Sequence, residues 1–223
     1  MHKAPEEFRF AAIAVDIVVF GIKDNTLCLL LDEVNRPPHY QNIDAFIGGL
    51  IGVDETADDA VVRHLRDKAG IKNVYTEQLY TFSNINRDKR NRVISVSYMA
   101  IVRPDVVERY VHSSAHWTPV APLLKLAYDH DEMLKVGLAR LQGKLGYTTI
   151  VQYLLPTEFT LTEMQQVYEL VTKKEFDKRN FRKKVLALDI IKETGNVQEG
   201  VKNRPAALYV FRNKNVQELQ LFV

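Results

Sequence analysis

Residues 49–71, GLIGVDETADDAVVRHLRDKAGI, decide the fold of this chain. The stretch opens on Gly49, reaches Glu55 after five residues, and closes shortly after Gly70. Residues 57–69 contain neither glycine nor proline and predict a helix, which Gly70 ends because glycine readily adopts the left-handed conformation of a helix C-cap. Because β-rich apolar runs precede and follow this helix, the sequence predicts a domain that combines a sheet with helices.

The spacing within this stretch resembles the Nudix box of diphosphate hydrolases: G, five residues, E, seven residues, then R-E-U-x-E-E-x-G-U, where U is aliphatic. The residues that match in position and type are Gly49, Glu55, Arg63, Leu65, Gly70 and Ile71. The positions that require glutamate but hold other residues are His64, Asp67 and Lys68. Because these positions are three and four residues apart, we expect their side chains on one face of the helix.

The chemistry of that face argues against the reaction of the hydrolases. Three glutamates would hold divalent cations through oxygen, and the cations would activate water for attack on a diphosphate. The ammonium of Lys68 would repel such a cation, by several kcal/mol even at an effective dielectric constant of about 20. We therefore expect no divalent metal cofactor, no catalytic residue and no enzymatic activity.

Two alternatives stand beside this interpretation of the box. The match could be a chance agreement of common residues. The chain could also be a residual magnesium-dependent hydrolase of ADP-ribose or a related nucleoside diphosphate, with a weak metal site at Glu55 and Asp67.

Composition excludes several classes of protein. A hydrophobic fraction of 46% with 26% charged residues is typical of globular chains, which excludes wholesale disorder. The single cysteine, Cys28, lies in an apolar run, so no disulfide can form within the chain. No apolar stretch approaches the roughly 18 residues of a membrane span, and Glu6 and Glu7 before the first apolar run are unlike a signal peptide. We expect a cytoplasmic protein without a membrane partner.

Charge is distributed unevenly along the chain. Residues 1–155 carry 18 basic and 19 acidic side chains, a net charge of −1, whereas residues 156–215 carry 12 basic and 8 acidic side chains, a net charge of +4. A basic C-terminal part indicates a polyanionic partner. The predicted division is an N-terminal domain at 1–145, a linker at 146–156 and a second domain at 157–223.

The N-terminal domain is predicted to be an α/β/α sandwich. Its expected elements are strands at 11–20 and 27–31, a loop from 36 to 47, the box helix at 57–69, strands at 74–83 and 92–102, a strand end near 117, and a helix at about 131–142. The first two strands flank the turn sequence Lys23-Asp24-Asn25 and therefore predict a hairpin.

The C-terminal domain is predicted to be a winged helix-turn-helix. Thr160 and Glu163 have the spacing of a capping box, which opens a first helix with one apolar stripe. Asp177 is the expected N-cap of a second helix that runs from Lys178 to about Leu188. A strand, a polar loop and a further strand follow, which predicts a two-stranded wing.

Basic side chains on the second helix indicate DNA binding. Phe181 and Val185 share one face and are expected to pack inward, which turns the basic residues of the first two turns outward. Cations at a helix N-terminus oppose the helix dipole, and a phosphate backbone would compensate for this cost. The candidate DNA-binding residues are Lys178, Arg179, Asn180, Arg182 and Lys183 on the helix and Lys202, Asn203 and Arg204 on the wing. The alternatives are a solvated charged face and a module that binds RNA or protein.

Taken together, these features resemble the Nudix-related transcriptional regulators of the NrtR family over nearly the whole chain. The resemblance also rests on segments at residues 86–96, 127–130, 159–161, 179–185 and 203–209. It implies a ligand-responsive regulator, usually a repressor released by its effector, that binds palindromic double-stranded operator DNA as a homodimer. The N-terminal domain would sense a small sugar, a sugar phosphate or an ADP-ribose-like metabolite.

A polar turn before the strand at 92–102 supplies the candidate effector-binding residues. They are Arg87, Asp88, Arg90 and Arg92. Guanidinium groups bind phosphate through paired hydrogen bonds, and a carboxylate accepts from sugar hydroxyls. The alternative is a polar hairpin tip without a ligand. The expected loop at 41–47 lacks the Trp and Leu-Pro that related proteins often carry there, which leaves the identity of the effector open.

Overall fold

The computed structural model describes residues 10–108, 114–120, 124–200 and 205–220. Two compact units share the chain: unit 1 comprises residues 1–20, 28–100 and 110–137, and unit 2 comprises residues 21–27, 101–109 and 138–223. The units interleave along the sequence instead of following one another. The predicted domain boundaries at 145 and 157 therefore stay predictions.

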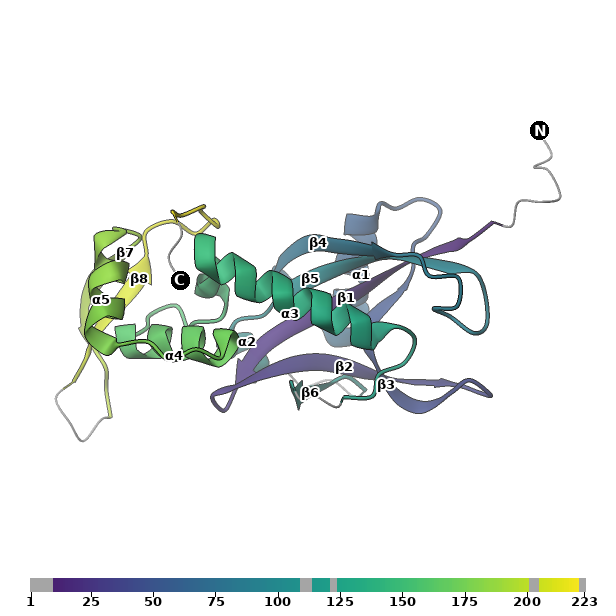
Figure 1. The fold of residues 1–223 in the computed structure, drawn as a ribbon, viewed down its shortest axis with the longest axis horizontal. Helices are drawn as coiled ribbons and strands as arrows, with labels where there is room; N and C mark the ends of the chain where they lie inside the picture. The colour runs from purple at the N-terminus through teal and green to yellow at the C-terminus, as the bar shows by residue number, and fades with distance from the viewer. Residues whose placement is uncertain (1–9, 109–113, 121–123, 201–204, 221–223) are drawn as a thin grey trace. The chain divides into compact units, whose positions relative to one another are not determined.

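Unit 1 is built around a six-stranded sheet with the strand order β4-β5-β1-β3-β2-β6 (Figure 1). The strands are β1 (Ala12–Lys23), β2 (Thr26–Arg36), β3 (Tyr40–Leu50), β4 (Tyr75–Phe82), β5 (Val93–Ile101) and β6 (His116–Pro119). The predicted hairpin of β1 and β2 is present, and its turn residues Asp24 and Asn25 both have positive φ, 48° and 56°. Short polar side chains tolerate this conformation, which matches the twist of the two strands.

The segment before the box helix is the strand β3, so the predicted loop at 36–47 is wrong over most of its length. β3 pairs antiparallel with β1, which sets Gly48 opposite Asp16, and antiparallel with β2. Its N-terminal half contains Gln41, Asn42 and Asp44, residues that are typical of loops. The sheet nevertheless pairs Asp44 with Glu33, and its register shifts between Ile43 and Tyr40, where Asn42 has φ 46°. Strand preference depends more on neighbouring strands than on single residues.

Two helices cover opposite faces of this sheet (Figure 1). α1 (Ala57–Ala69) packs on β3, where His64 lies against Gly49. α3 (His130–Tyr147) begins on the other face, where the ring of His130 stacks on Phe46 at 5.0 Å. Residues 46 and 49 are an odd number apart on one strand and therefore point to opposite faces.

The limits of α1 agree with the predicted helix at 57–69, and both of its ends are capped. Thr56 and Asp59 form a capping box, in which the Asp59 N–H donates to Thr56 Oγ1 at 3.1 Å. Gly70 has φ 62°, and its N–H donates to Arg66 O at 2.9 Å. The glycine of the box is therefore required by a left-handed C-cap. α3, in contrast, continues to Tyr147, beyond its predicted end near Gln142.

Unit 2 contains the predicted winged helix-turn-helix. Its helices are α4 (Leu161–Thr172) and α5 (Lys178–Ala187), and the antiparallel pair β7 (Ile191–Val197) and β8 (Ala207–Phe211) follows them. This unit also contains α2 (Pro104–Glu108) and the 3-10 helix η1 (Ile150–Tyr153). Buried Tyr168 of α4 and Phe181 of α5 pack together with ring centroids 5.5 Å apart. The segment expected as a linker, 146–156, contains the end of α3 and all of η1, whose Ile150 and Val151 are buried.

Candidate effector cavity and DNA-binding helix

A cavity of about 640 Å³ opens in unit 1, and Asp16 and Phe46 are among the residues that line it. β1, β2, β3, the last turn of α1 and the turn between β4 and β5 all contribute to its wall. The four predicted effector-binding residues, Arg87, Asp88, Arg90 and Arg92, line this cavity. The structure therefore brings these four residues together, and their contact with an effector stays a prediction.

Arg87 is buried and joins distant parts of the cavity floor. Its Nη2 donates to Asp16 Oδ2 at 2.9 Å, and its Nε and Nη2 donate to the Asp129 carboxylate at 2.9–3.2 Å. A buried guanidinium needs such carboxylates, because an unpaired charge in the interior is costly. Arg87 therefore holds the wall of the cavity together, and its paired donors are engaged within the chain.

Asp16 is the shared acceptor of this buried network. It accepts from Ser95 Oγ at 2.7 Å, and His130 Nε2 lies 3.5 Å from its Oδ1. His130 Nδ1 accepts from the Phe46 N–H at 2.9 Å, so a neutral ring carries its proton on Nε2, toward Asp16. Burial raises the pKa of Asp16, but His130, Arg87 and Ser95 together outweigh burial and hold that pKa well below its usual range.

Asp88 and Arg90 form a pair at the rim of the cavity. Asp88 accepts from Arg90 Nε at 3.1 Å and from Arg90 Nη2 at 2.8 Å. The guanidinium also lies over the rings of Tyr40 and Tyr128, 5.8 and 5.6 Å from their centroids. Tyr128 has φ 59°, a conformation that is uncommon for an aromatic residue and costs on the order of 1–3 kcal/mol. The rim is therefore pre-arranged at an energetic cost.

Arg92, the last of the four predicted residues, closes the base of the turn. Its Nη1 donates to Ser83 O at 3.0 Å and to Asn84 O at 3.1 Å. The three arginines of the turn thus all have acceptors within the protein. They shape the cavity wall. A phosphate could accept from the same guanidinium nitrogens only if it displaced the acceptor that each nitrogen now has within the protein.

The box residues Glu55 and Arg63 bind each other. Arg63 Nε donates to Glu55 Oε2 at 2.8 Å, and the Gly52 N–H donates to Glu55 Oε1 at 2.6 Å. The hydrogen bonds from Arg63 and from the Gly52 backbone lower the pKa of Glu55 to about 2. The matching residues of the box therefore fix the loop before α1.

The three altered box positions lie three and four apart on α1, as their spacing predicts, but their side chains have different surroundings. His64 is buried, with Nε2 3.2 Å from Leu50 O, and burial lowers its pKa. Asp67 turns to solvent, where it accepts from Arg66 Nε at 2.7 Å. Lys68 Nζ donates to Gly48 O at 2.6 Å and lines the cavity. Although the three share a helix face, their side chains end at different depths, which the spacing of Cα atoms does not show.

No metal-binding group is found in the described part of the chain. Within those ranges, no three His, Cys, Asp or Glu side chains are gathered so that they could hold an ion. The residues at the box do not fit a divalent cation, because Asp67 points away and Lys68 is itself positive.

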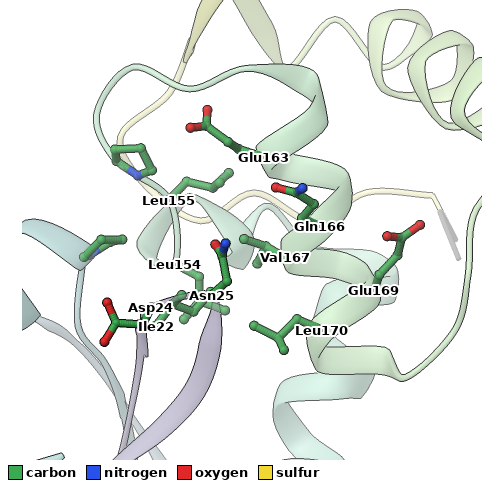
Figure 2. Close-up of a pocket in the computed structure, with 12 residues that line it drawn as sticks. Ile22, Asp24, Asn25, Leu154, Leu155, Glu163, Gln166, Val167, Glu169 and Leu170 are labelled. Atoms are coloured by element: carbon green, nitrogen blue, oxygen red, sulfur yellow. The ribbon is translucent and has the colours of Figure 1, made fainter. Parts of the chain in front are cut away.

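A second cavity, of about 600 Å³, lies in unit 2 (Figure 2). Apolar side chains line part of it, and α4 contributes Glu163, Gln166 and Glu169. Glu163 is engaged in the capping box of α4, and Glu169 accepts from Gln165 Nε2 at 2.9 Å and from the Phe176 N–H at 3.1 Å. Both carboxylates of α4 therefore serve the structure of the helix-turn-helix.

α5 presents its basic residues to solvent, as its sequence predicts. Phe181 and Val185 are buried, whereas the predicted contacts Lys178, Arg179, Asn180, Arg182 and Lys183 are exposed. Asp177 caps the helix by accepting from the Asn180 N–H at 2.9 Å. The predicted wing contacts Lys202, Asn203 and Arg204 lie outside the described residues. Contact of any of these residues with DNA stays a prediction.

Sequence reasoning missed several residues that line the cavity or support its wall. Asp16 and Ser95 hold the floor, and Tyr128 stands at the rim. A signal for Asp16 was available, because it is the one charged residue in the apolar run 11–20 and charges are rarely buried without a partner. Its partner Arg87 lies 71 residues away, and no local pattern connects the two.

Comparisons with known proteins agree with this architecture. Residues 11–136 match the NUDIX domain family, and residues 151–211 match the NrtR DNA-binding winged helix domain. The chain is 31% identical over 205 residues to the ADPR responsive transcriptional repressor NtrR of Acinetobacter baylyi, covering 89% of this chain and 81% of that protein.

Solved structures of Shewanella oneidensis NrtR are also similar. Its complex with a 27mer DNA has a TM-score of 0.79 and 30% identity, with 90% of this chain and 93% of that chain covered. Its NUDIX domain complexed with ADP ribose has a TM-score of 0.53 and 28% identity, with 62% of this chain and 94% of that chain covered.

A Nudix domain joined to a DNA-binding winged helix defines a class of ligand-responsive transcriptional regulator. This chain belongs to the NrtR family of these regulators. The predicted fold class and family are confirmed, and a chance match of the box is excluded. No helix in the described ranges is long and apolar enough to cross a membrane.

Proposed function

We propose that this chain represses transcription by binding palindromic operator DNA as a homodimer, and that a metabolite in the unit 1 cavity releases it. The observation that carries this proposal is the exposed basic surface on the first two turns of α5, opposite the buried Phe181 and Val185. A capped helix with this arrangement suits the major groove, where arginine reaches base edges and lysine meets phosphates.

The effector that we propose is ADP-ribose or a close relative of it. Its support is the similarity to a repressor named as responsive to ADPR and to a NUDIX domain complexed with ADP ribose. The cavity volume of about 640 Å³ lies within the range of roughly 300–1,000 Å³ that is typical of small-molecule sites. Small sugars and sugar phosphates are the alternatives.

We also propose that the chain does not hydrolyse this effector. Hydrolysis in the Nudix manner needs a metal-activated water, and the described box residues offer Lys68 where a carboxylate is required. Effector binding and DNA binding should therefore both proceed without a divalent metal. The similar proteins named above are regulators, which agrees with a role in binding.

Operator binding by the full-length chain tests this proposal. Duplexes selected from a random library would be labelled, and their affinity measured by fluorescence anisotropy across a salt series, with and without ADP-ribose. We expect a palindromic site, a steep loss of affinity with salt, with a slope of roughly −0.9 for each phosphate contacted, and release by ADP-ribose. Selection of no common site, or a salt-independent affinity, would refute DNA recognition by α5. Operator binding that sugars release and ADP-ribose does not would refute the proposed effector alone.

A further inference from the structure

Lys68 is the one altered position of the box that faces the cavity. Glu55, His64 and Asp67 are absent from the cavity lining, because Glu55 pairs with Arg63, His64 is buried against β3, and Asp67 turns to Arg66. The position that would hold a metal ligand in a hydrolase thus carries a positive charge into the cavity.

The contacts of Lys68 leave its charge available inside the cavity. Nζ donates to Gly48 O at 2.6 Å, a neutral carbonyl 20 residues away in sequence. Within the described residues, no ion pair neutralises this ammonium. One of its three N–H groups serves the carbonyl, which leaves two donors. The side chain is half-buried, so water screens its charge less than at the surface.

Two cations of the cavity, Arg87 and Arg90, differ from Lys68 in this respect, whereas Arg36 and Arg92 donate to backbone carbonyls as Lys68 does but lie outside the box. Arg87 is held by Asp16 and Asp129, and Arg90 is held by Asp88, so their charges are offset by carboxylates. An anionic ligand would have to compete with these carboxylates for the guanidinium groups. Lys68 requires no such exchange.

We propose that the Lys68 ammonium binds the diphosphate of the effector and takes the place of the metal cation that the related hydrolases use. This inference rests on the proposed function, since it assumes a diphosphate effector. An ammonium attracts phosphate oxygens by charge and by hydrogen bonds but cannot supply a bound hydroxide. The substitution of lysine for glutamate therefore separates diphosphate recognition from hydrolysis.

Titration calorimetry of the full chain with ADP-ribose tests this role. We expect the wild-type affinity to be the same in EDTA and in magnesium. Lys68→Met should weaken ADP-ribose binding about 10- to 100-fold, the usual range for losing a charged hydrogen-bonding partner. Lys68→Arg keeps the charge and should recover most of the affinity.

Two controls show whether a loss of ADP-ribose affinity in Lys68→Met comes from the charge in the cavity. The other possible causes are the net charge of the helix and misfolding of the variant. Arg66→Met removes a cation of the same helix that points to solvent, and its affinity for ADP-ribose should equal that of the wild type. Adenosine, which lacks phosphate, should bind the wild type and Lys68→Met equally, which also shows that the variant is folded.

The outcomes discriminate between this inference and the proposed function. If the wild type binds ADP-ribose only with magnesium, or if Lys68→Met binds ADP-ribose as tightly as the wild type, the role of Lys68 is overturned and the effector stands. If the wild type binds ADP-ribose under neither condition, the proposed effector fails, and the inference fails with it.

Discussion

The charged residues of unit 1 and those of α5 are arranged in opposite ways. In unit 1, guanidinium groups are bound within the chain: Arg63 to Glu55, Arg87 to Asp16 and Asp129, and Arg90 to Asp88. On α5, Arg179 and Arg182 are exposed, and among the described residues neither has a hydrogen bond or an ion pair. Charges that pair inside the chain stabilise the fold, whereas exposed charges of one sign are suited to an external partner.

This difference indicates how a hydrolase scaffold serves a regulator. The box retains the residues that shape its loop and helix, Gly49, Glu55, Arg63 and Gly70, and differs where the carboxylates would bind metal. The pair of Arg63 and Glu55 fixes the loop before α1 and therefore serves the fold. We expect the two sets of charges to respond differently to mutation.

Replacing both Arg179 and Arg182 with alanine should have the largest effect, on DNA affinity alone. Two lost contacts at about 1–3 kcal/mol each should lower operator affinity by about 2–6 kcal/mol in total, measured by fluorescence anisotropy. The melting temperature should hardly change, because the two side chains are exposed. Arg66→Ala on α1 is the matched control, with wild-type affinity. Unaltered operator binding by the double variant would contradict the assignment of α5.

Asp16→Asn should lower the free energy of unfolding. The substitution leaves buried Arg87 with Asp129 as its remaining carboxylate, so we expect a loss of about 3 kcal/mol, the low end for breaking a buried ion pair. Urea denaturation would measure it. The exposed pair gives the contrast, since Asp67→Asn should leave the free energy of unfolding almost unchanged. Equal costs for the two substitutions would show that burial of the Arg87 network contributes nothing.

Removing the N-cap hydroxyls of α1 and α4 should lower the free energy of unfolding by a smaller amount. Thr56→Ala and Thr160→Ala each remove a hydroxyl that accepts a backbone N–H at 3.1 Å. We expect losses of about 0.5–2 kcal/mol, larger for Thr160 because it is buried and Thr56 is exposed. Thermal denaturation would measure both, with threonine-to-serine variants as controls. A larger loss for Thr56 would be inconsistent with the burial of the two caps.

The smallest effect should be a pH dependence from Glu55. Its pKa is lowered from 4.5 to about 2 in the folded chain, so its pairing stabilises the protein above pH 4.5 and is lost as the pH falls toward 2. Glu55→Gln should therefore lose less stability than the wild type over this interval, measured by denaturation at several pH values. Parallel losses in the two proteins would mean that Arg63 does not hold the carboxylate in solution.

The Asp67→Asn variant also addresses the alternative of a residual hydrolase. The structure turns Asp67 to Arg66 and away from the cavity. Release of phosphate-containing products from ADP-ribose and magnesium, monitored by chromatography, should be absent in the wild type. Steady turnover that this substitution removes would instead establish an enzyme.

Elements that depend on neighbouring residues were predictable from the sequence. The apolar spacing and the caps of α1, α4 and α5 are contained in short windows, because helix hydrogen bonds join residues four apart. The predicted bounds at 57–69 and the predicted caps Thr160 and Asp177 are confirmed for that reason. The strand β3 was missed because its N-terminal half contains polar residues, and its pairing with β1 and β2 is a property of the assembled sheet.

Residue type and local spacing were sufficient to predict α1, α4 and α5, the hairpin, the family and the basic face of α5. The partners of the charged side chains in the cavity depend instead on the assembled fold. The contacts of Arg87 with Asp16 and of Lys68 with Gly48 span 71 and 20 residues and require the turn of Arg87 and the helix α1 to pack on the sheet, where register sets Asp16 opposite Gly48. Register sets which side chains face one another across a sheet, and that choice is a property of the assembled fold.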